Sequence, residues 1–435
     1  MCIDVAGNQK AVGVEKALPL REKRMVDRRR VITGMGSALA SAVVGLAPRI
    51  TLSQERPPLV PGLPEGVYDT AILDALPGKK PLIKLTYRPP NYETPVSYFK
   101  TAITPNDAFF VRYHLADIPE SIEATSWRLQ VGGEAAATPF QLSLAELQTG
   151  FEQVEITAVC QCAGNRRGLS QPHVPGVEWG LGAMGGAVWR GVRLRDLLAK
   201  AGLRKEAVEI VVNGADGPVN DKTPDFVKSI PLWKALDENT IVAHRMNEQP
   251  LPHFNGFPAR LIVPSWTVTY WMKHLVIVEA VAKPFDGFWM KAAYRIPTGK
   301  FPIVQHFLSQ MTDVNEPITE VVVNSVIAFP ADNQQLRVGQ PLEVGGVAWD
   351  GGYGVRQVEI STDNRTTWRP ADLGPDLGRF AFRSWGYRFT PQTPGNHTIA
   401  VKASNLIGQT QTESLIFNPA GYHNNVVRSL TITAV

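Results

Sequence analysis

Short runs of alternating apolar and polar residues fill the last part of the chain, from about residue 315 to residue 435. The runs are ITEVVVNSVIAFP, QPLEVGGVAW, VRQVEIST, GNHTIAVKASN and RSLTITAV, and they are separated by turn-forming clusters such as WDGGYG, STDNRTT and TPQTPG. Period-two alternation is typical of strands with one buried face. Several such strands without helices predict an all-β, immunoglobulin-like sandwich, which we place at residues 313–435.

Residues 96–312 combine apolar runs of strand length with two short helical patterns, which predicts a mixed α+β domain. The expected strands are Phe109–Arg112, Arg128–Val131, Gln153–Val159, Glu209–Val212, Arg260–Val263 and Leu275–Val281. The expected helices are Leu144–Leu147 and Leu194–Ala201. Residues 48–95 are rich in proline (RPPLVPGLPEG, YRPPNYETP) and are expected to form an extended surface arm with little regular structure.

The N-terminal residues resemble an export signal. Residues 27–33 read DRRRVIT, which resembles the twin-arginine pattern of two arginines, a spacer and two apolar residues. The apolar run that follows, residues 31–46, is too short and too weak for a membrane span. We expect a twin-arginine signal at residues 1–47, a periplasmic location and no stable membrane insertion. An N-terminal membrane anchor is the alternative. Twin-arginine export carries folded proteins, which favours an enzyme that receives its cofactor before export.

Composition and charge exclude some partners. The chain is 44% hydrophobic and 19% charged, as an ordinary globular protein is. Residues 1–42 hold eight Lys and Arg against four Asp and Glu, so this segment carries the whole formal surplus of +4. The basic isoelectric point is therefore no sign of nucleic-acid binding.

The stretch AVCQCAGNRRG, residues 158–168, carries the strongest chemical signal. It holds two of the three cysteines, Cys160 and Cys162, at a spacing that offers neither a disulfide framework nor a C-x-x-C zinc pair. The thiols stand at the end of an expected strand, and Arg166 and Arg167 follow a Gly-Asn turn. Nearby positive charge favours a thiolate, which is a nucleophile or a soft metal ligand. A buried, inert cysteine pair fits the same residues.

Three further segments hold candidate site residues. FFVRYHL places Arg112 and His114 on one face of an expected strand. Arg260 begins an apolar strand, and Lys273 follows a Trp/Tyr cluster. Tyr294 lies in the aromatic loop DGFWMKAAYRIP. Each residue taken alone also fits ordinary core or surface packing.

Together these segments resemble the sulfite oxidase family of molybdenum enzymes. The resemblance rests on QCAGNRR (Gln161–Arg167), FFVRYHL, the segments Val177–Leu198 and Met246–Pro264, and the C-terminal domain, and it covers nearly all of residues 95–435. The arginine-rich presequence and FFVRYH are most similar to the bacterial periplasmic sulfite dehydrogenases within this family. The resemblance implies a molybdopterin-binding domain followed by a dimerisation domain, with one molybdenum–molybdopterin cofactor per chain.

The resemblance also implies roles for particular residues. Cys162 matches the molybdenum-ligating cysteine, Arg112 and Arg167 match the anion-pocket arginines, and Tyr294 matches the active-site tyrosine. The expected cofactor contacts are His114, Asp216, Asn255, Arg260 and Lys273. Asn255 departs from a histidine of the vertebrate enzymes, and Tyr270 departs from an arginine, for which Arg379 or Arg383 could substitute. Trp179 is expected to wall the pocket, and Cys160 is interpreted as structural.

The implied activity is oxidation of sulfite to sulfate, with electrons passed singly to a c-type cytochrome. Fixed guanidinium groups suit a small dianion because arginine stays protonated and donates in pairs. The sequence has no His-Pro-Gly-Gly stretch, C-x-x-C-H motif or strand-linked G-x-G-x-x-G, so we expect no haem and no dinucleotide site on this chain. We expect a homodimer or a heterodimer with a cytochrome.

Four alternatives remain at this point. Nitrate reduction shares the cysteine motif, and oxidation of a sulfane sulfur shares the cofactor. The pair Arg166–Arg167 favours free sulfite over a sulfane. A metal-free hydrolase that uses Cys162 with His114 as base would leave the arginines unexplained. A β-sandwich adhesin would explain only residues 315–435.

Overall fold

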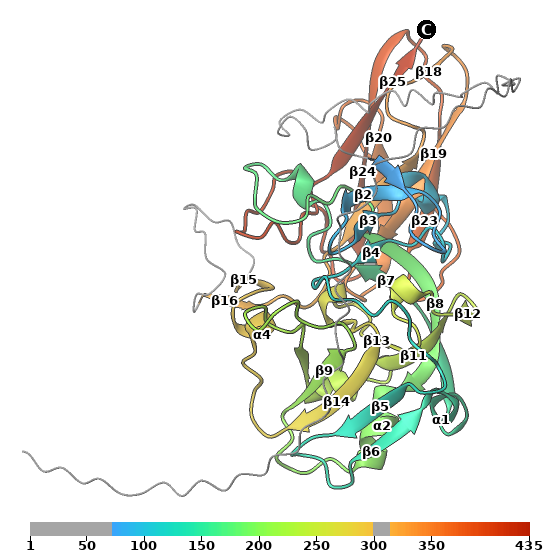
Figure 1. Cartoon of the computed structure of the whole chain (residues 1–435). Coiled ribbons are helices and arrows are strands. Elements are labelled where there is room, and N and C mark those ends of the chain that lie inside the picture. The colour runs from blue at the N-terminus through green and yellow to red at the C-terminus, as the bar shows by residue number, and fades with distance from the viewer. Residues whose placement is uncertain (1–71, 299–313) are drawn as a thin grey trace, which may run out of the picture. The chain divides into compact units, whose positions relative to one another are not determined.

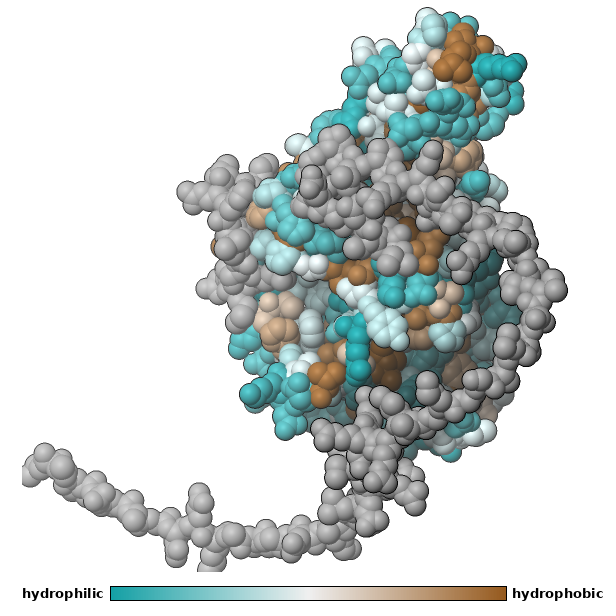
Figure 2. Space-filling model, turned by 45° about the horizontal axis from the view of Figure 1, so that its top comes forward, coloured by the Kyte–Doolittle hydropathy of each residue, from teal (hydrophilic) through white to brown (hydrophobic). Residues whose placement is uncertain are grey.

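The computed structural model describes residues 72–298 and 314–435 (Figure 1). The expected export signal at residues 1–47 and the first part of the expected arm, residues 48–71, lie outside these residues. No helix within the described ranges is both long and apolar enough to cross a membrane. On the face in Figure 2, hydrophilic side chains surround small, separate hydrophobic patches.

Residues 72–95 differ from the expected arm because they form regular structure. The strands β1 (Ile72–Asp74), β2 (Leu82–Thr86), β3 (Asn91–Glu93) and β4 (Val111–Arg112) form an antiparallel four-stranded sheet. Leu82, Tyr92 and Val111 are fully buried in one small core cluster. This apolar contact pairs the segment with β4 despite its prolines, and it brings β3 beside Arg112.

The α+β domain contains two five-member strand groups, which confirms the expected fold class. One sheet has the order β10-β9-β14-β5-β6 and the other the order β12-β11-β8-β7, with β13 paired to β11. The strands of the first sheet are β5 (Arg128–Gly132), β6 (Phe140–Ser143), β9 (Glu209–Gly214), β10 (Lys228–Pro231) and β14 (Leu275–Val281). Those of the second are β7 (Gln153–Gln161), β8 (Met184–Arg193), β11 (Ile241–Met246), β12 (Gln249–Pro250) and β13 (Arg260–Ile262).

Short helices connect these strands. The α-helices are α1 (Leu144–Thr149), α2 (Leu194–Ala201), α3 (Leu232–Ala235) and α4 (Phe288–Lys291). The 3-10 helices are η1 (Val96–Lys100), η2 (Arg167–Leu169), η3 (His253–Asn255) and η4 (Val268–Tyr270). A capping box of Ser143 and Glu146 begins α1, and Gly202 in a left-handed conformation ends α2.

Two strands, β15 (Arg295–Pro297) and β16 (Asn315–Pro317), pair between the two domains. The all-β part that follows is a sandwich of two sheets, as the alternating pattern predicts. Its sheets have the orders β17-β19-β23-β22 and β18-β25-β24-β20-β21 (Figure 1, orange to red). The strands are β17 (Asn324–Phe329), β18 (Gln334–Leu336), β19 (Leu342–Trp349), β20 (Val355–Ser361), β21 (Arg369–Pro370), β22 (Asp372–Leu373), β23 (Arg383–Phe389), β24 (Gly395–Asn405) and β25 (Arg428–Ala434).

Candidate active site

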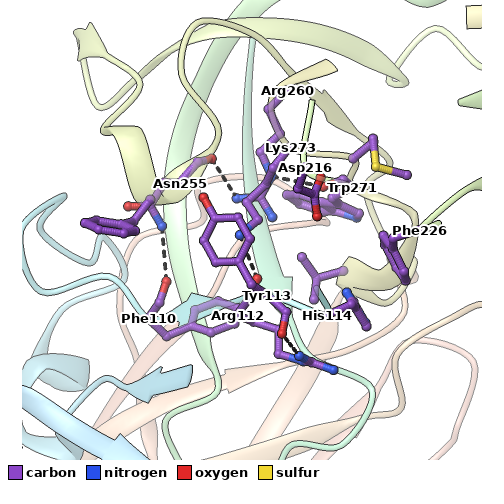
Figure 3. A pocket seen from close by; sticks show the side chains of 13 residues that line it. Phe110, Arg112, Tyr113, His114, Asp216, Phe226, Asn255, Arg260, Trp271 and Lys273 are labelled. Atoms are coloured by element: carbon purple, nitrogen blue, oxygen red, sulfur yellow. Dashed lines mark hydrogen bonds between the residues drawn. The ribbon is translucent and has the colours of Figure 1, made fainter. Parts of the chain in front are cut away.

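A pocket in the α+β domain collects six of the residues singled out in the sequence (Figure 3). The six are Arg112, His114, Asp216, Asn255, Arg260 and Lys273. They come from β4 and the loop after it, the loop after β9, η3, β13 and the residues before β14. Residues far apart in the sequence therefore meet at one place.

The pocket lining is electropositive. Arg112, Arg260 and Lys273 line it, and Asp216 is the one carboxylate among the lining residues. Lys273 Nζ donates a 2.7 Å hydrogen bond to the carbonyl of Arg112 and lies over the ring of Tyr113. Burial, and then the charge of Arg260, holds the pKa of Lys273 well below its ordinary value. Such a lining suits a ligand that brings negative charge.

Arg260 is held by three protein acceptors. Its Nε and Nη1 donate to the carbonyls of Trp271 and Asn255, and its Nη2 lies 3.5 Å from the Cys160 sulfur. Burial raises the pKa of Cys160 to about 11 although Arg260 opposes the shift, so this thiol stays protonated. Cys160 therefore packs as a neutral structural residue behind the pocket, as the sequence interpretation has it.

Asn255 lines the pocket, but its side chain is used within the protein. Its Oδ1 accepts a hydrogen bond from Lys79 Nζ, and its Nδ2 donates to the carbonyl of Phe110 at 3.1 Å. Lys79 also donates to the carbonyls of Asn106 and Phe109. Asn255 thus fixes the pocket wall, and the sequence analysis missed Lys79 because that residue precedes every motif.

Tyr294 extends the site beyond the pocket. Its hydroxyl accepts a 3.3 Å hydrogen bond from Arg112 Nη2 and contacts His114 Nε2. Burial lowers the pKa of Arg112, but the electrostatic interactions with Tyr294 and then Cys162, together with the hydrogen bond to Tyr294, outweigh it and raise that pKa. Burial, followed by the positive charge of Arg112, holds the pKa of His114 well below its ordinary value, so the imidazole is neutral.

Cys162 stands directly after β7, at the start of a tight turn. Its backbone N–H donates to Ala183 O at 2.9 Å, and Asn165 Oδ1 accepts from Ala183 N at 3.1 Å. Arg166 follows with a left-handed φ of 70°. The strand end and the turn place a buried thiol, 4% exposed, within electrostatic reach of Arg112 and Tyr294.

The two adjacent arginines of the motif have different environments. Arg167 Nε donates to Ala420 O at 2.7 Å, and its guanidinium lies 5.4 Å from the centre of the Tyr422 ring. Burial raises the pKa of Tyr294, and Arg167 is near enough to oppose that shift, as Arg112 also does. Arg166 points elsewhere, because it donates to the carbonyls of Ser325 and Val426 in the sandwich. Arg166 therefore links the two domains, and Arg167 is the arginine of this motif that the resemblance assigns to the anion pocket.

Tyr422, from the C-terminal domain, is a site residue that the sequence analysis missed. Its ring stacks on Tyr294 with centroids 5.7 Å apart. Burial, followed by Tyr294, raises the pKa of Tyr422, while Arg167 and Arg112 oppose the shift. No spacing signal in the sequence joins Tyr422 to a site more than 100 residues earlier; only its place in an aromatic, glycine-containing loop, AGYHNN, marks it.

Tyr270 occupies the position at which the resemblance implies an arginine, and a lysine, Lys228, lies beside it. Lys228 Nζ is 4.5 Å from the centre of the Tyr270 ring. Arg379 and Arg383, the substitutes considered from the sequence, line a different pocket in the sandwich, beside Tyr353 and Phe382. Neither arginine is among the residues that line the candidate active site.

The donor set fits a molybdopterin cofactor. Cys162 offers a free, buried thiol, which is a soft donor that suits a transition metal carried by a cofactor. The indole N–H of Trp179 is buried and has no hydrogen-bond partner among the described residues. Trp179 packs edge-on against Phe110 of the pocket. Unused donors and excess positive charge are what an anionic cofactor needs.

Comparison with known proteins identifies the family of both domains. The model of the oxidoreductase molybdopterin binding domain matches residues 115–289, and that of the Mo-co oxidoreductase dimerisation domain matches residues 315–434. The sulfane dehydrogenase SoxCD from Paracoccus pantotrophus has a similar fold, with a TM-score of 0.68 and 21% identity, over 89% of this chain and 93% of that chain.

Curated relatives include enzymes with two activities. Mitochondrial sulfite oxidase of Macaca fascicularis is 34% identical over 321 residues, which is 72% of this chain and only 57% of the relative's length. Sulfite oxidase of Gallus gallus is 33% identical over 353 residues, 78% of this chain and 75% of the relative. Nitrate reductase of Hordeum vulgare is 30% identical over 391 residues, 82% of this chain and 42% of the relative. The chain belongs to the sulfite oxidase family of molybdopterin-binding oxidoreductases.

Proposed function

We propose that this protein oxidises sulfite to sulfate at a molybdenum–molybdopterin cofactor and passes the electrons singly to a c-type cytochrome. The observation that carries the proposal is the convergence of Arg112 and His114 on the Tyr294 hydroxyl, with Cys162 and Arg167 in electrostatic reach. The convergence combines fixed positive charge, a hydroxyl donor and a thiol in a buried place. A small dianion and a soft, redox-active metal are the ligands that such a set favours.

The cofactor, when bound, supplies the two-electron redox change and the transfer of an oxygen atom. Cys162 would provide the protein's thiolate ligand, and Arg260, Lys273 and Asp216 would hold the pterin. Arg112 offers its guanidinium to the anion without a change of protonation state. The Tyr294 hydroxyl donates to an anion oxygen, because the raised pKa of Tyr294 keeps its proton in place.

His114 orients Tyr294. Its imidazole stacks on Phe226 with centroids 3.6 Å apart, which fixes the ring plane and points Nε2 at the Tyr294 hydroxyl. A neutral imidazole adds no positive charge and can accept or donate a hydrogen bond. Around the Tyr294 hydroxyl, Arg112 and Arg167 are therefore the permanently charged side chains that can recognise an anion.

The test is turnover by purified, molybdenum-loaded protein with three substrates: sulfite, thiosulfate as a sulfane sulfur, and nitrate. Ferricyanide and then cytochrome c serve as acceptors for the first two, and a reduced viologen serves as donor for nitrate. The proposal expects rapid sulfite-dependent reduction of both acceptors. Preferential turnover of thiosulfate or nitrate would replace sulfite with that substrate and leave the family assignment unchanged.

We further propose periplasmic export by the twin-arginine route and a dimeric assembly. The DRRRVIT stretch supports the export route, and the match to a dimerisation domain supports a homodimer, with a cytochrome heterodimer as the alternative. Replacing Arg28 and Arg29 with lysine should retain the protein in the cytoplasm on cell fractionation. Light scattering should give about twice the mass of the mature chain for the homodimer.

A further inference from the structure

Lys228 on β10 is a fully buried lysine whose charge has no carboxylate partner in the described part of the chain. Its side chain is 0% exposed, and its Nζ donates one hydrogen bond, 2.7 Å long, to the carbonyl of Trp289. The ammonium lies 4.5 Å from the centre of the Tyr270 ring and 5.4 Å from that of Tyr294. A buried ammonium is costly unless an opposite charge balances it.

Two other buried lysines show what a balanced environment looks like. Lys234 Nζ lies 2.8 Å from the carboxylate of Asp237, so its charge is paired. Lys79 donates to two carbonyls and to the side chain of Asn255, so its donors are satisfied. Lys228 has three donors and uses one on a described residue. Within the described residues, its charge faces the rings of Tyr270 and Tyr294 and no carboxylate.

The groups that face Lys228 are mainly neutral or positive. Arg295 on β15 repels its ammonium, and Lys228 in turn helps to hold the pKa of His114 low. The phenols of Tyr270 and Tyr294 both keep their protons, because burial raises their pKa values. Glu209 on β9 acts on Tyr270 and is not among the groups that shift the pKa of Lys228.

We propose that Lys228 is a further anion-recognition residue of this site, and that binding of an oxyanion at Arg112 and Tyr294 draws a proton onto Lys228 Nζ. The proposal rests on the proposed function for the class of ligand, a sulfur oxyanion. Lys228 Nζ lies 5.4 Å from the centre of the Tyr294 ring, and the hydroxyl of the same ring contacts Arg112 and His114. A dianion bound at that hydroxyl would therefore supply a counter-charge to the buried ammonium. Lys228 thus acts through Tyr294 as a positioning and charge-balancing residue.

The environment of Lys228 determines how the affinity for the anion should change with pH. Burial, and then the charge of Arg295, lowers the pKa of Lys228 to about 7, so amine and ammonium coexist near neutral pH. A bound dianion favours the ammonium and raises that pKa. Affinity for the anion is therefore fullest below about pH 7 and falls as the pH rises through that value. An arginine at this position would stay protonated and remove the dependence.

The test uses cofactor-loaded, oxidised protein and sulfate, which is a dianion throughout the range studied. Isothermal titration calorimetry at about pH 6.5 and about pH 8.5, in two buffers that differ in ionisation enthalpy, gives both the Kd and the protons taken up. The proteins are the wild type, Lys228→Met, Lys228→Arg and Lys234→Met. The last removes another buried lysine, whose partner Asp237 is not among the residues of the site.

The wild type should take up a fraction of a proton per sulfate near neutral pH and bind several-fold more weakly at the higher pH. Lys228→Met should weaken sulfate binding by roughly tenfold to a hundredfold and abolish proton uptake. Its KM for sulfite should rise while kcat changes little. Lys228→Arg should keep the affinity and lose the pH dependence, and Lys234→Met should bind sulfate as the wild type does.

Unchanged sulfate affinity and unchanged proton uptake in Lys228→Met would overturn the inference. Equal weakening in Lys228→Met and Lys234→Met would also overturn it, because the effect would then be one of folding. Failure of the proposed function gives a different result: the wild type itself would neither oxidise sulfite nor bind sulfate.

Discussion

Glu93 Oε1 accepts a hydrogen bond of 2.6 Å from the backbone N–H of Gly182. Its Oε2 accepts another, of 2.7 Å, from Gly180, so one buried carboxylate holds both amides of the loop that follows Trp179. The same loop gives its carbonyls to the motif turn: Gly180 O accepts from Arg166 N and Ala183 O accepts from Cys162 N. Glu93 on β3 therefore positions the turn that carries the thiol.

The glycines of this loop are required by the same contacts. A Cβ at Gly182 would lie 1.8 Å from the Thr94 carbonyl, and one at Gly180 would lie 2.8 Å from Glu93 Oε1. The spacing in WGLG, residues 179–182, is thus explained by a carboxylate more than 80 residues earlier in the chain.

We predict that Glu93→Gln destabilises the Cys162 turn. A glutamine offers one acceptor oxygen, and its amide group would face a backbone N–H, so about 1–3 kcal/mol of unfolding free energy should be lost. Denaturant unfolding and molybdenum content per chain measure the effect. Glu155→Gln is the matched control, because Glu155 is exposed and pairs with Arg190 at the surface. Wild-type stability and molybdenum content in Glu93→Gln would contradict the positioning role.

We predict that Cys162→Ser gives a folded protein without sulfite oxidation, because a serine hydroxyl is a poor substitute for a soft thiolate ligand. Circular dichroism checks the fold, and turnover with ferricyanide checks the activity. Cys160→Ser is the comparison: its thiol is buried and protonated, so activity should persist while stability falls by about 1 kcal/mol. Wild-type turnover by Cys162→Ser would remove the ligand assignment.

Arg112→Gln should raise the KM for sulfite by roughly a hundredfold, since a charge-assisted contact to the anion is lost. It should also free the Tyr294 hydroxyl from one of its two partners. Steady-state kinetics with sulfite measure the change. The control is Arg190→Gln, which removes an exposed arginine from β8. An unchanged KM in Arg112→Gln would place that residue outside the anion pocket.

Stability should fall with acid because some buried histidines stay neutral in the folded protein. Burial, followed by Arg245, lowers the pKa of His244 to about 4, and His244 Nε2 pairs with Gln153 Oε1 at 2.7 Å. The unfolded chain binds a proton below about pH 6.5 while the folded chain does not, so stability is full above that pH and declines below it. His244→Gln should flatten the decline between about pH 6.5 and about pH 5 by about 1 kcal/mol in denaturant titrations. An identical slope in the variant would refute this origin.

The sequence predicted those helices and strands whose ends are set by the spacing of their own apolar residues. Helix α2 begins and ends where its amphipathic pattern does, and β14 and the long β24 follow their apolar alternation. Residues 72–95 differ because their strands are stabilised by contacts with β4, not by their own pattern. Proline content alone does not reveal such distant pairing.

The candidate site was predicted where a motif carries its residues and missed where only the fold does. The motif residues Arg112, His114 and Cys162 meet around Tyr294. Tyr422, Lys228 and Glu93 have no motif, and each acts through a contact that spans two elements or two domains. Arg166 is the opposite case: it belongs to the motif, but its side chain contacts the C-terminal domain and not the pocket.

The most direct test of the central claim is a single-turnover experiment. Oxidised, molybdenum-loaded protein is mixed with excess sulfite under anaerobic conditions without an acceptor, and the sulfate formed is measured by ion chromatography. The account predicts one sulfate per molybdenum within the mixing time, and none with Cys162→Ser. No sulfate from fully loaded wild-type protein would contradict it.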